Sequence, residues 1–180
     1  MGKNLFIIAQ IIGGIAFLLS LIAYHREKKE KILGNMILSN LLNLIHYLLL
    51  GAYSGCITKI IAICRDYFII LKSKNKLFSS NIFLIIFILI YIVTGILTYK
   101  SIWSVLPLLA AIIYIVPVWN GDELTIKKTA FLCYFLWLIY NIFAFSIAGI
   151  VSNVISIIST FIAIKNNNIK YKETNYERIR

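Results

Sequence analysis

Long apolar runs that carry almost no charge recur from one end of this chain to the other. Each is near the ~17–25 residues that a helix needs to cross the hydrocarbon of a bilayer. Hydrophobic residues make up 61% of the chain and charged residues 14%, which excludes an ordinary water-soluble domain. The pattern predicts an all-α polytopic membrane protein. We expect seven transmembrane helices, over residues 4–24, 32–51, 54–71, 81–99, 102–119, 129–145 and 147–164.

The first run, 4–24, is also long enough to resemble a secretory signal peptide. A single basic residue precedes it, however, and no small-x-small cleavage pattern follows it. We therefore expect a retained helix. The three cysteines, Cys56, Cys64 and Cys133, form no CxxC pair and lie in apolar runs. They indicate small membrane hydrophobes, and we expect neither a disulfide framework nor a metal or other cofactor.

Lys and Arg gather in alternate connections between these runs. Fourteen of them fall in the loops 25–31, 72–76 and 120–128 and in the tail from residue 165, against only Lys3 and Lys100 on the other side. Because cytoplasmic loops are enriched in Lys and Arg, seven spans place the N-terminus outside and the C-terminus in the cytoplasm. This distribution explains the net charge of +11 better than nucleic-acid binding, which we do not expect.

The chain resembles itself at an offset of 94 residues. Turn and polar positions then align in the pairs Gly55/Gly149, Thr58/Ser152, Lys59/Asn153 and Asp66/Thr160. Two copies of three helices, joined through one extra helix, run parallel about an axis along the membrane normal, as in SWEET transporters. We expect a first three-helix repeat over 1–76, a linker helix over 77–100, a second repeat over 101–165 and a polar cytoplasmic tail over 166–180.

Four stretches carry a family resemblance: IHYLLLGAYSG with Arg65 after it, LPLLAAIIY at 106–114, WLIYN at 137–141 and IAGIVSNVISIIST at 147–160. Through them, nearly the whole chain up to Lys165 resembles the bacterial inner membrane protein YgjV family. The resemblance implies a small transporter fold in the inner membrane, similar to the SWEET, PQ-loop and nicotinamide-riboside transporter group. It transfers no catalytic residues. The chain lacks the Pro-Gln dipeptide of PQ-loop proteins and the hinge prolines that SWEET proteins carry in helices 1, 2 and 6.

Three charged residues, Lys59, Arg65 and Asp66, lie inside one apolar run. Charges at membrane depth are costly, so they indicate a functional site by default. Lys59 and Asp66 are seven residues apart, which places them on one helix face about 10 Å apart along the axis, too far to touch without a third group. Arg65 should point elsewhere, with an anchor at the lipid interface as one role. For Lys59 and Asp66, pairing for stability and lining a substrate path both stay open.

Other polar and aromatic residues complete the substrate-path candidates: Asn43 and His46 in the second run, Trp137, Tyr140 and Asn141 in the sixth, and Asn153 and Ser156 in the seventh. Asn43 and His46 continue a polar stripe at helical spacing. For all of these residues the alternative role is interhelical hydrogen bonding or packing, and His46 is also a candidate proton switch. The repeat predicts that Lys59 faces Asn153 near the midplane.

The sequence favours a carrier for a small polar solute such as a sugar, a nucleoside or a vitamin, working by alternating access between the two three-helix bundles. Pro107 and Pro117 each remove an intrahelical hydrogen bond and are hinge candidates. Motifs such as HExxH, GxSxG and Walker A are absent from the sequence, so we do not expect an enzyme. The alternative is a non-transporting membrane protein that binds a partner or anionic lipid through its basic cytoplasmic face. Whether the working unit is a homodimer stays open.

Overall fold

The computed structural model describes residues 2–24, 29–120 and 123–179. Within these ranges the chain is helical and contains no strand. The α-helices are α1 (Lys3–Tyr24), α2 (Lys29–Leu49), α3 (Tyr53–Lys74), α4 (Asn81–Leu97), α5 (Leu106–Asn120), α6 (Glu123–Phe143) and α7 (Ile147–Ile179). Two short 3-10 turns, η1 (Lys76–Ser79) and η2 (Ile102–Val105), precede α4 and α5. The predicted all-α fold with seven helices is confirmed.

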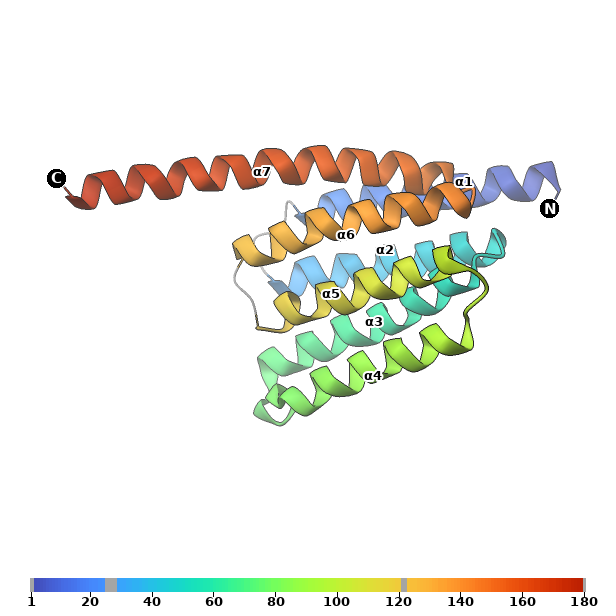
Figure 1. Cartoon of the computed structure of the whole chain (residues 1–180), viewed down its shortest axis with the longest axis horizontal. Helices are drawn as coiled ribbons and strands as arrows, with labels where there is room; N and C mark the ends of the chain where they lie inside the picture. Colours follow the sequence, from blue (N-terminus) through green and yellow to red (C-terminus); the bar gives the residue numbers. More distant parts are fainter. Residues whose placement is uncertain (1, 25–28, 121–122, 180) are drawn as a thin grey trace.

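The helices form two rows that close into a flattened ring. One row is α1, α2 and α3, the other is α7, α6 and α5, and the rows meet at their ends through α1 with α7 and α3 with α5. Helix α4 packs outside the ring against α3 and α5. Successive helices alternate in direction, so the N-terminus and the C-terminus lie at opposite ends of the bundle (Figure 1). The α2–α3, α4–α5 and α6–α7 connections therefore share the end that holds the N-terminus.

Three helix boundaries differ from the prediction by four residues or more, and the first is the start of α6, at Glu123 rather than 129. Helix α7 continues to Ile179, although the prediction ended it at residue 164. Hydropathy falls there, but no Gly or Pro stands between residues 165 and 179 to stop a helix. Helix α5 begins at Leu106 rather than 102 because the four preceding residues form η2. Pro107, in the first turn of α5, occupies a position at which no N–H bond is needed.

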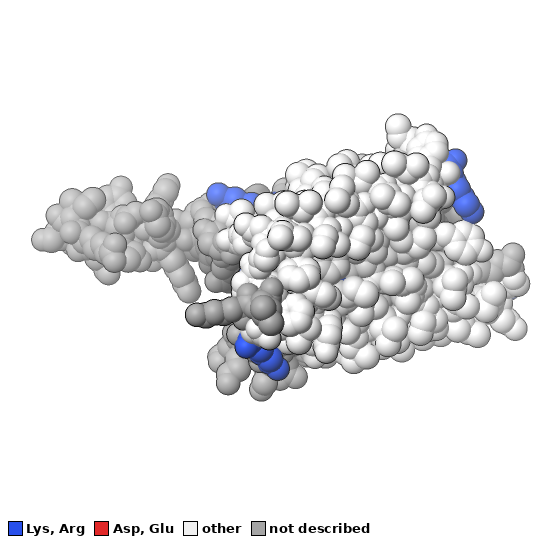
Figure 2. All heavy atoms as spheres, turned by 90° about the horizontal axis from the view of Figure 1, so that it is seen from below, with Lys and Arg blue, Asp and Glu red and all other residues white. Residues whose placement is uncertain are grey.

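Among the residues that the structure describes, three segments are long and apolar enough to cross a membrane: Lys3–Ile22, Ile102–Asn120 and Thr125–Phe143. The apolar helices Leu33–Leu49, Asn81–Leu97 and Ile147–Ile162 are shorter. The bundle nevertheless presents large apolar side chains outward, for instance Ile82, Ile96 and Leu97 of α4 at 64%, 73% and 77% exposure. Figure 2 shows one face of the bundle with Lys and Arg at its two ends and uncharged residues between them. That surface suits lipid contact rather than water.

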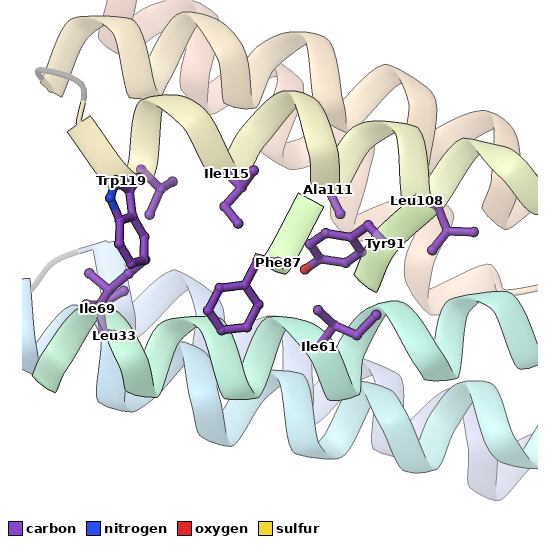
Figure 3. Close-up of a cluster of buried hydrophobic side chains, with 10 residues drawn as sticks. Leu33, Ile61, Ile69, Phe87, Tyr91, Leu108, Ala111, Ile115 and Trp119 are labelled. Atoms are coloured by element: carbon purple, nitrogen blue, oxygen red, sulfur yellow. The ribbon is translucent and has the colours of Figure 1, made fainter. Parts of the chain in front are cut away.

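The largest apolar core lies where α4 packs against α3 and α5. Phe87 and Tyr91 of α4 meet Ile61 and Ile69 of α3 and a row of α5 side chains that includes Ile115. Figure 3 shows these side chains pointing toward one another from the three helices. The region around α2, α6 and the α6–α7 turn has a smaller apolar cluster around Tyr47, Cys56 and Tyr140 and side-chain hydrogen bonds between helices. Four of the sequence candidates lie there: His46, Trp137, Tyr140 and Asn141.

Candidate functional site

Asp66 lies in a charged cluster with Arg65 and Asn40. The Arg65 guanidinium donates to Asp66 Oδ1 from Nε at 2.9 Å and from Nη2 at 2.7 Å, and Asn40 Nδ2 donates to Oδ2 at 3.3 Å. Arg65 also lies over the Tyr114 ring at 5.5 Å. Arg65 and Asp66 are 6% and 2% exposed. A buried ion pair needs such additional hydrogen bonds to offset its desolvation.

The expectation that Arg65 points away from Asp66 is wrong. Neighbouring residues on a helix point about 100° apart, but the flexible stem of Arg65 bends back so that its planar guanidinium meets the neighbouring carboxylate. Arg65 and Asn40 are therefore the hydrogen-bond partners of Asp66, and Lys59 is left outside this cluster.

Lys59 reaches from α3 toward the opposite row of helices. Its Nζ lies 4.1 Å from the centroid of the Trp137 ring of α6. Trp137 in turn stacks on Tyr47 of α2, with ring centroids 5.8 Å apart and an interplanar angle of 24°. In the described part of the chain, Lys59 makes no ion pair and no hydrogen bond through its side chain.

His46 links three parts of the bundle. Its Nδ1 lies 2.6 Å from the Ala9 carbonyl oxygen of α1, and its Nε2 lies 2.7 Å from Ser146 Oγ in the α6–α7 turn. A carbonyl can only accept, so Nδ1 carries the proton. In the neutral imidazole, Nε2 then accepts from the Ser146 hydroxyl, while Ser146 Oγ accepts from Gly149 N at 3.0 Å. Every polar atom of His46 is satisfied, which favours a role in holding helices together.

Tyr47 and Tyr140 extend this network between the two rows. The Tyr47 hydroxyl donates to Asn141 Oδ1 at 2.8 Å. The Tyr140 oxygen accepts from Gly55 N at 3.0 Å and from Ser54 Oγ at 3.1 Å, and its hydroxyl lies 3.3 Å from the Ala52 carbonyl oxygen. Tyr140 thus ties α6 to the first turn of α3. We name His46, Tyr47, Tyr140, Asn141 and Ser146 the central polar cluster.

A pocket of about 230 Å³ opens at the bundle end that holds the N-terminus. Its walls come from the α2–α3 turn, the α4–α5 connection and the end of α6, and they include Ser54, Lys100 and Tyr140. Lys100 Nζ lies 4.6 Å from the centroid of the Tyr53 ring. We name this the end pocket. Tyr140 belongs to both the end pocket and the central polar cluster, so the two are adjacent.

The two turns beside the end pocket have the same backbone structure. In the first, Gly51 N donates to Leu48 O and Ala52 N to Tyr47 O, and in the second, Phe145 N donates to Ile142 O and Ser146 N to Asn141 O. Gly51 and Phe145 both adopt a left-handed backbone, with φ of 70° and 52°. Both helices therefore end in a Schellman motif. Corresponding residues are 94 apart, the offset found in the sequence.

Five other candidates lie outside these contacts. Asn43 Nδ2 donates to the Ser39 carbonyl of its own helix at 3.1 Å. Asn153 is 8% exposed and Ser156 is half-buried, and neither side chain has a hydrogen-bond partner among the described residues. Pro117 lies inside α5, whereas Pro107, in the first turn, removes no intrahelical bond. That Asn153 faces Lys59 stays a prediction.

Sequence reasoning missed Tyr47, Ser54, Ser146 and the pairing role of Arg65. The offset of 94 residues carried a signal for Tyr47, because it aligns that residue with Asn141, its hydrogen-bond partner. Ser54 and Ser146 gave no signal, since serine is common at helix contacts in membranes. No group of three His, Cys, Asp or Glu residues that could hold a metal ion occurs in the described ranges.

Comparison with known proteins gives one match. A family model described as a bacterial inner membrane protein, Imp-YgjV, matches residues 7–168. No curated protein matches the chain, and neither does any solved structure. The matched range covers all seven helices apart from the extension of α7 and the first residues of α1.

Proposed function

The chain belongs to the Imp-YgjV family of bacterial inner membrane proteins, and from that premise we propose that it is a carrier for a small polar solute. In this proposal the solute enters through the end pocket and passes between the two rows of helices. All seven helices cross the membrane, and no step is enzymatic. The basic end of the bundle faces the cytoplasm, as the distribution of Lys and Arg favours.

The observation that carries the proposal is the position of Tyr140. It lines the end pocket, and it also bonds to Ser54 and Gly55 at the start of α3. Behind it lie polar side chains contributed by both rows: Tyr47, Asn141 and Lys59. From Ser54 to Asp66, α3 advances about 18 Å at ~1.5 Å per residue, and Lys59 lies between them. Polar side chains inside ~30 Å of hydrocarbon are costly, so a line of them across the bundle indicates a path for a solute.

The shared turn structure supports an architecture of two related halves. A half-turn that exchanges the halves would bring α1, α2 and α3 onto α5, α6 and α7, and the ring order of the helices permits it. Tyr47 and Asn141 are equivalent positions at the offset of 94 residues, and they bond to each other. A pseudo-twofold axis would therefore pass between them, where repeat transporters bind substrate.

Pro117 supports α5 as the moving element. It lies in the interior of α5, where it cannot donate the hydrogen bond that residue 113 would otherwise accept. Rocking of α5 at this point would open the rows at the basic end while the Tyr140 contacts close the end pocket. Pro107 takes no part in this motion.

Reconstituted liposomes test the carrier directly. We expect saturable uptake of at least one solute from a panel of sugars, nucleosides, vitamins and small carboxylates. In a background with Cys56, Cys64 and Cys133 replaced by alanine, a bulky maleimide on Thr98→Cys should block uptake, because Thr98 lines the end pocket. The same reagent on Ser79→Cys, in η1 at the opposite end, is the matched control and should leave uptake intact.

Two results would contradict the carrier. One is the absence of saturable flux for every solute of the panel. The other is flux that continues unchanged when Thr98→Cys carries the bulky group. The first result would leave the alternative of partner or anionic-lipid binding through the basic end.

A further inference from the structure

Lys59 is a cation inside the bundle without an anion. Asp66 already accepts three hydrogen bonds, two from Arg65 and one from Asn40. The charges of Lys59, Arg65 and Asp66 therefore sum to one positive charge inside the bundle, contributed by Lys59. Its ammonium has three N–H donors and no acceptor among the described residues. The Trp137 ring gives it only a cation–π contact, which is worth about 0.5–2 kcal/mol.

Other lysines over aromatic rings show what Lys59 lacks. Lys72 Nζ lies 4.5 Å from the Trp119 centroid and also donates to the Trp119 carbonyl at 3.0 Å. Lys100 lies over Tyr53 at the exposed end of the bundle, where water reaches it. Lys59 is half-buried, and its ammonium donates to no carbonyl among the described residues. A cation inside the bundle that has no anionic partner is costly at membrane depth, so such a residue points to a ligand.

The surroundings of Lys59 define what it can hold. Helix α3 packs against α2, α4 and α5, while α6 packs against α5 and α7. The contact between Lys59 and Trp137 therefore crosses the middle of the ring. Trp137 stacks on Tyr47 and meets Tyr140 edge-on, with centroids 5.7 Å apart. One ammonium beside an aromatic wall suits a solute with one negative charge and an apolar body, whereas a dianion would remain half-neutralised.

We propose that Lys59 binds the carboxylate of a small monoanionic solute, with Trp137 and Tyr47 as the wall against which the rest of the solute packs. This inference rests on the proposed carrier function and names its substrate class. On binding, the Lys59 ammonium leaves the Trp137 ring for the carboxylate, because an ion pair out of water is stronger than a cation–π contact.

Tryptophan fluorescence of the detergent-purified protein tests binding without transport. The probes are acetate, lactate and benzoate, each against its neutral amide: acetamide, lactamide and benzamide. At least one carboxylate should give a saturable change with at least about tenfold higher affinity than its amide. Lys59→Met should remove that preference, Lys59→Arg should keep it, and Trp137→Phe should remove the optical signal. Size-exclusion profiles and melting temperatures establish that each variant is folded.

The outcomes separate this inference from the carrier. Equal affinity for acid and amide, no binding of any carboxylate, or a preference that survives Lys59→Met would each overturn the anion site. Saturable flux of a neutral solute, unchanged in Lys59→Met, would also overturn it while the carrier stands. Carboxylate binding that depends on Lys59, with no flux of the same carboxylate in liposomes, would keep the anion site and remove the carrier.

Discussion

At the scale of single residues, Gly51 and Phe145 hold the same left-handed backbone with different side chains. Their φ values are 70° and 52°. Glycine adopts this conformation freely, whereas a residue with a Cβ does so at a cost of about 1–2 kcal/mol. The backbone of Phe145 is therefore strained in the α6–α7 turn, whereas the α2–α3 turn has glycine at the equivalent position. Its side chain is 75% exposed, so little packing compensates for that strain.

We expect Phe145→Gly to stabilise the protein. Relief of about 1 kcal/mol should raise the melting temperature in detergent by roughly 2–4 °C for a chain of this size. Gly51→Ala is the matched variant, and it should lower the melting temperature by a similar amount because it introduces the same strain. A thermal-shift assay measures the melting temperatures of the two variants and tests this prediction. A decrease for Phe145→Gly would show that the exposed ring contributes more than the strain costs.

Residue identities predicted the charged cluster only in part. The sequence singled out Asp66 and Lys59 and placed them too far apart to touch directly. It did not identify Arg65 as the partner, because helix geometry describes where a Cβ points and not where a long side chain ends. The Tyr47–Asn141 bond joins α2 and α6. The sequence alone does not show that these two helices face each other across the ring. Hydropathy reports which segments are apolar but not which helices are neighbours.

At the scale of helices, α1, α2 and α7 approach one another at Gly13. A Cβ at Gly13 would lie 2.9 Å from the Cβ of Ala148 and 2.9 Å from His46 Nδ1. The absence of a side chain at Gly13 is therefore what permits the His46 bond to the Ala9 carbonyl. Gly14, the next residue, has nothing within 4 Å of its added Cβ.

This pair of glycines gives a controlled test of helix packing. Gly13→Ala should destabilise the bundle by about 1–3 kcal/mol through overpacking and disturb the His46 bonds. Gly14→Ala should be neutral or stabilising by up to about 1 kcal/mol, since alanine favours helix. Melting temperatures in detergent measure both. Equal shifts for the two variants would mean that α1 does not approach α2 and α7 as closely as the structure has it.

Helix boundaries were predicted well where a physical signal marks them. The predicted ranges 32–51 and 54–71 locate the α2–α3 turn, and 129–145 and 147–164 locate the α6–α7 turn. Helices α2 and α3 each extend three residues into the neighbouring basic loop. The end of α7 differs from the prediction because the chain stays helical where its hydropathy falls. Membrane burial and helix formation are separate properties, and a polar segment without Gly or Pro satisfies only the second.

At the scale of the whole molecule, charge distinguishes the two ends of the bundle. Lys127 and Lys128 of α6 and the last turn of α3 lie at the end opposite the N-terminus. Part of the basic loop at 25–31 lies outside the described residues, as do the side chains of the tail from 166. The seven spans and their orientation remain a prediction from the distribution of Lys and Arg.

Thiol labelling in the cysteine-free background checks the topology. In whole cells, a membrane-impermeant maleimide should label Ser101→Cys, next to η2, and should not label Ser79→Cys in η1 until the membrane is opened. Both residues are exposed, so burial does not limit either reaction. Labelling of both positions in intact cells would contradict the seven-span topology, and labelling of Ser79→Cys alone would invert the orientation.

The single unbalanced charge at Lys59 has an electrical consequence for a carrier of this kind. Moving one elementary charge through the membrane potential involves about 2.3 kcal/mol per 100 mV. With a monoanion bound, the site is neutral, and its reorientation does no electrical work. The empty site keeps its positive charge, so the potential, negative inside, draws it toward the cytoplasm and resists its return. In such a carrier voltage would act on the unloaded step alone, and it would set the rate of turnover rather than the direction of the loaded crossing.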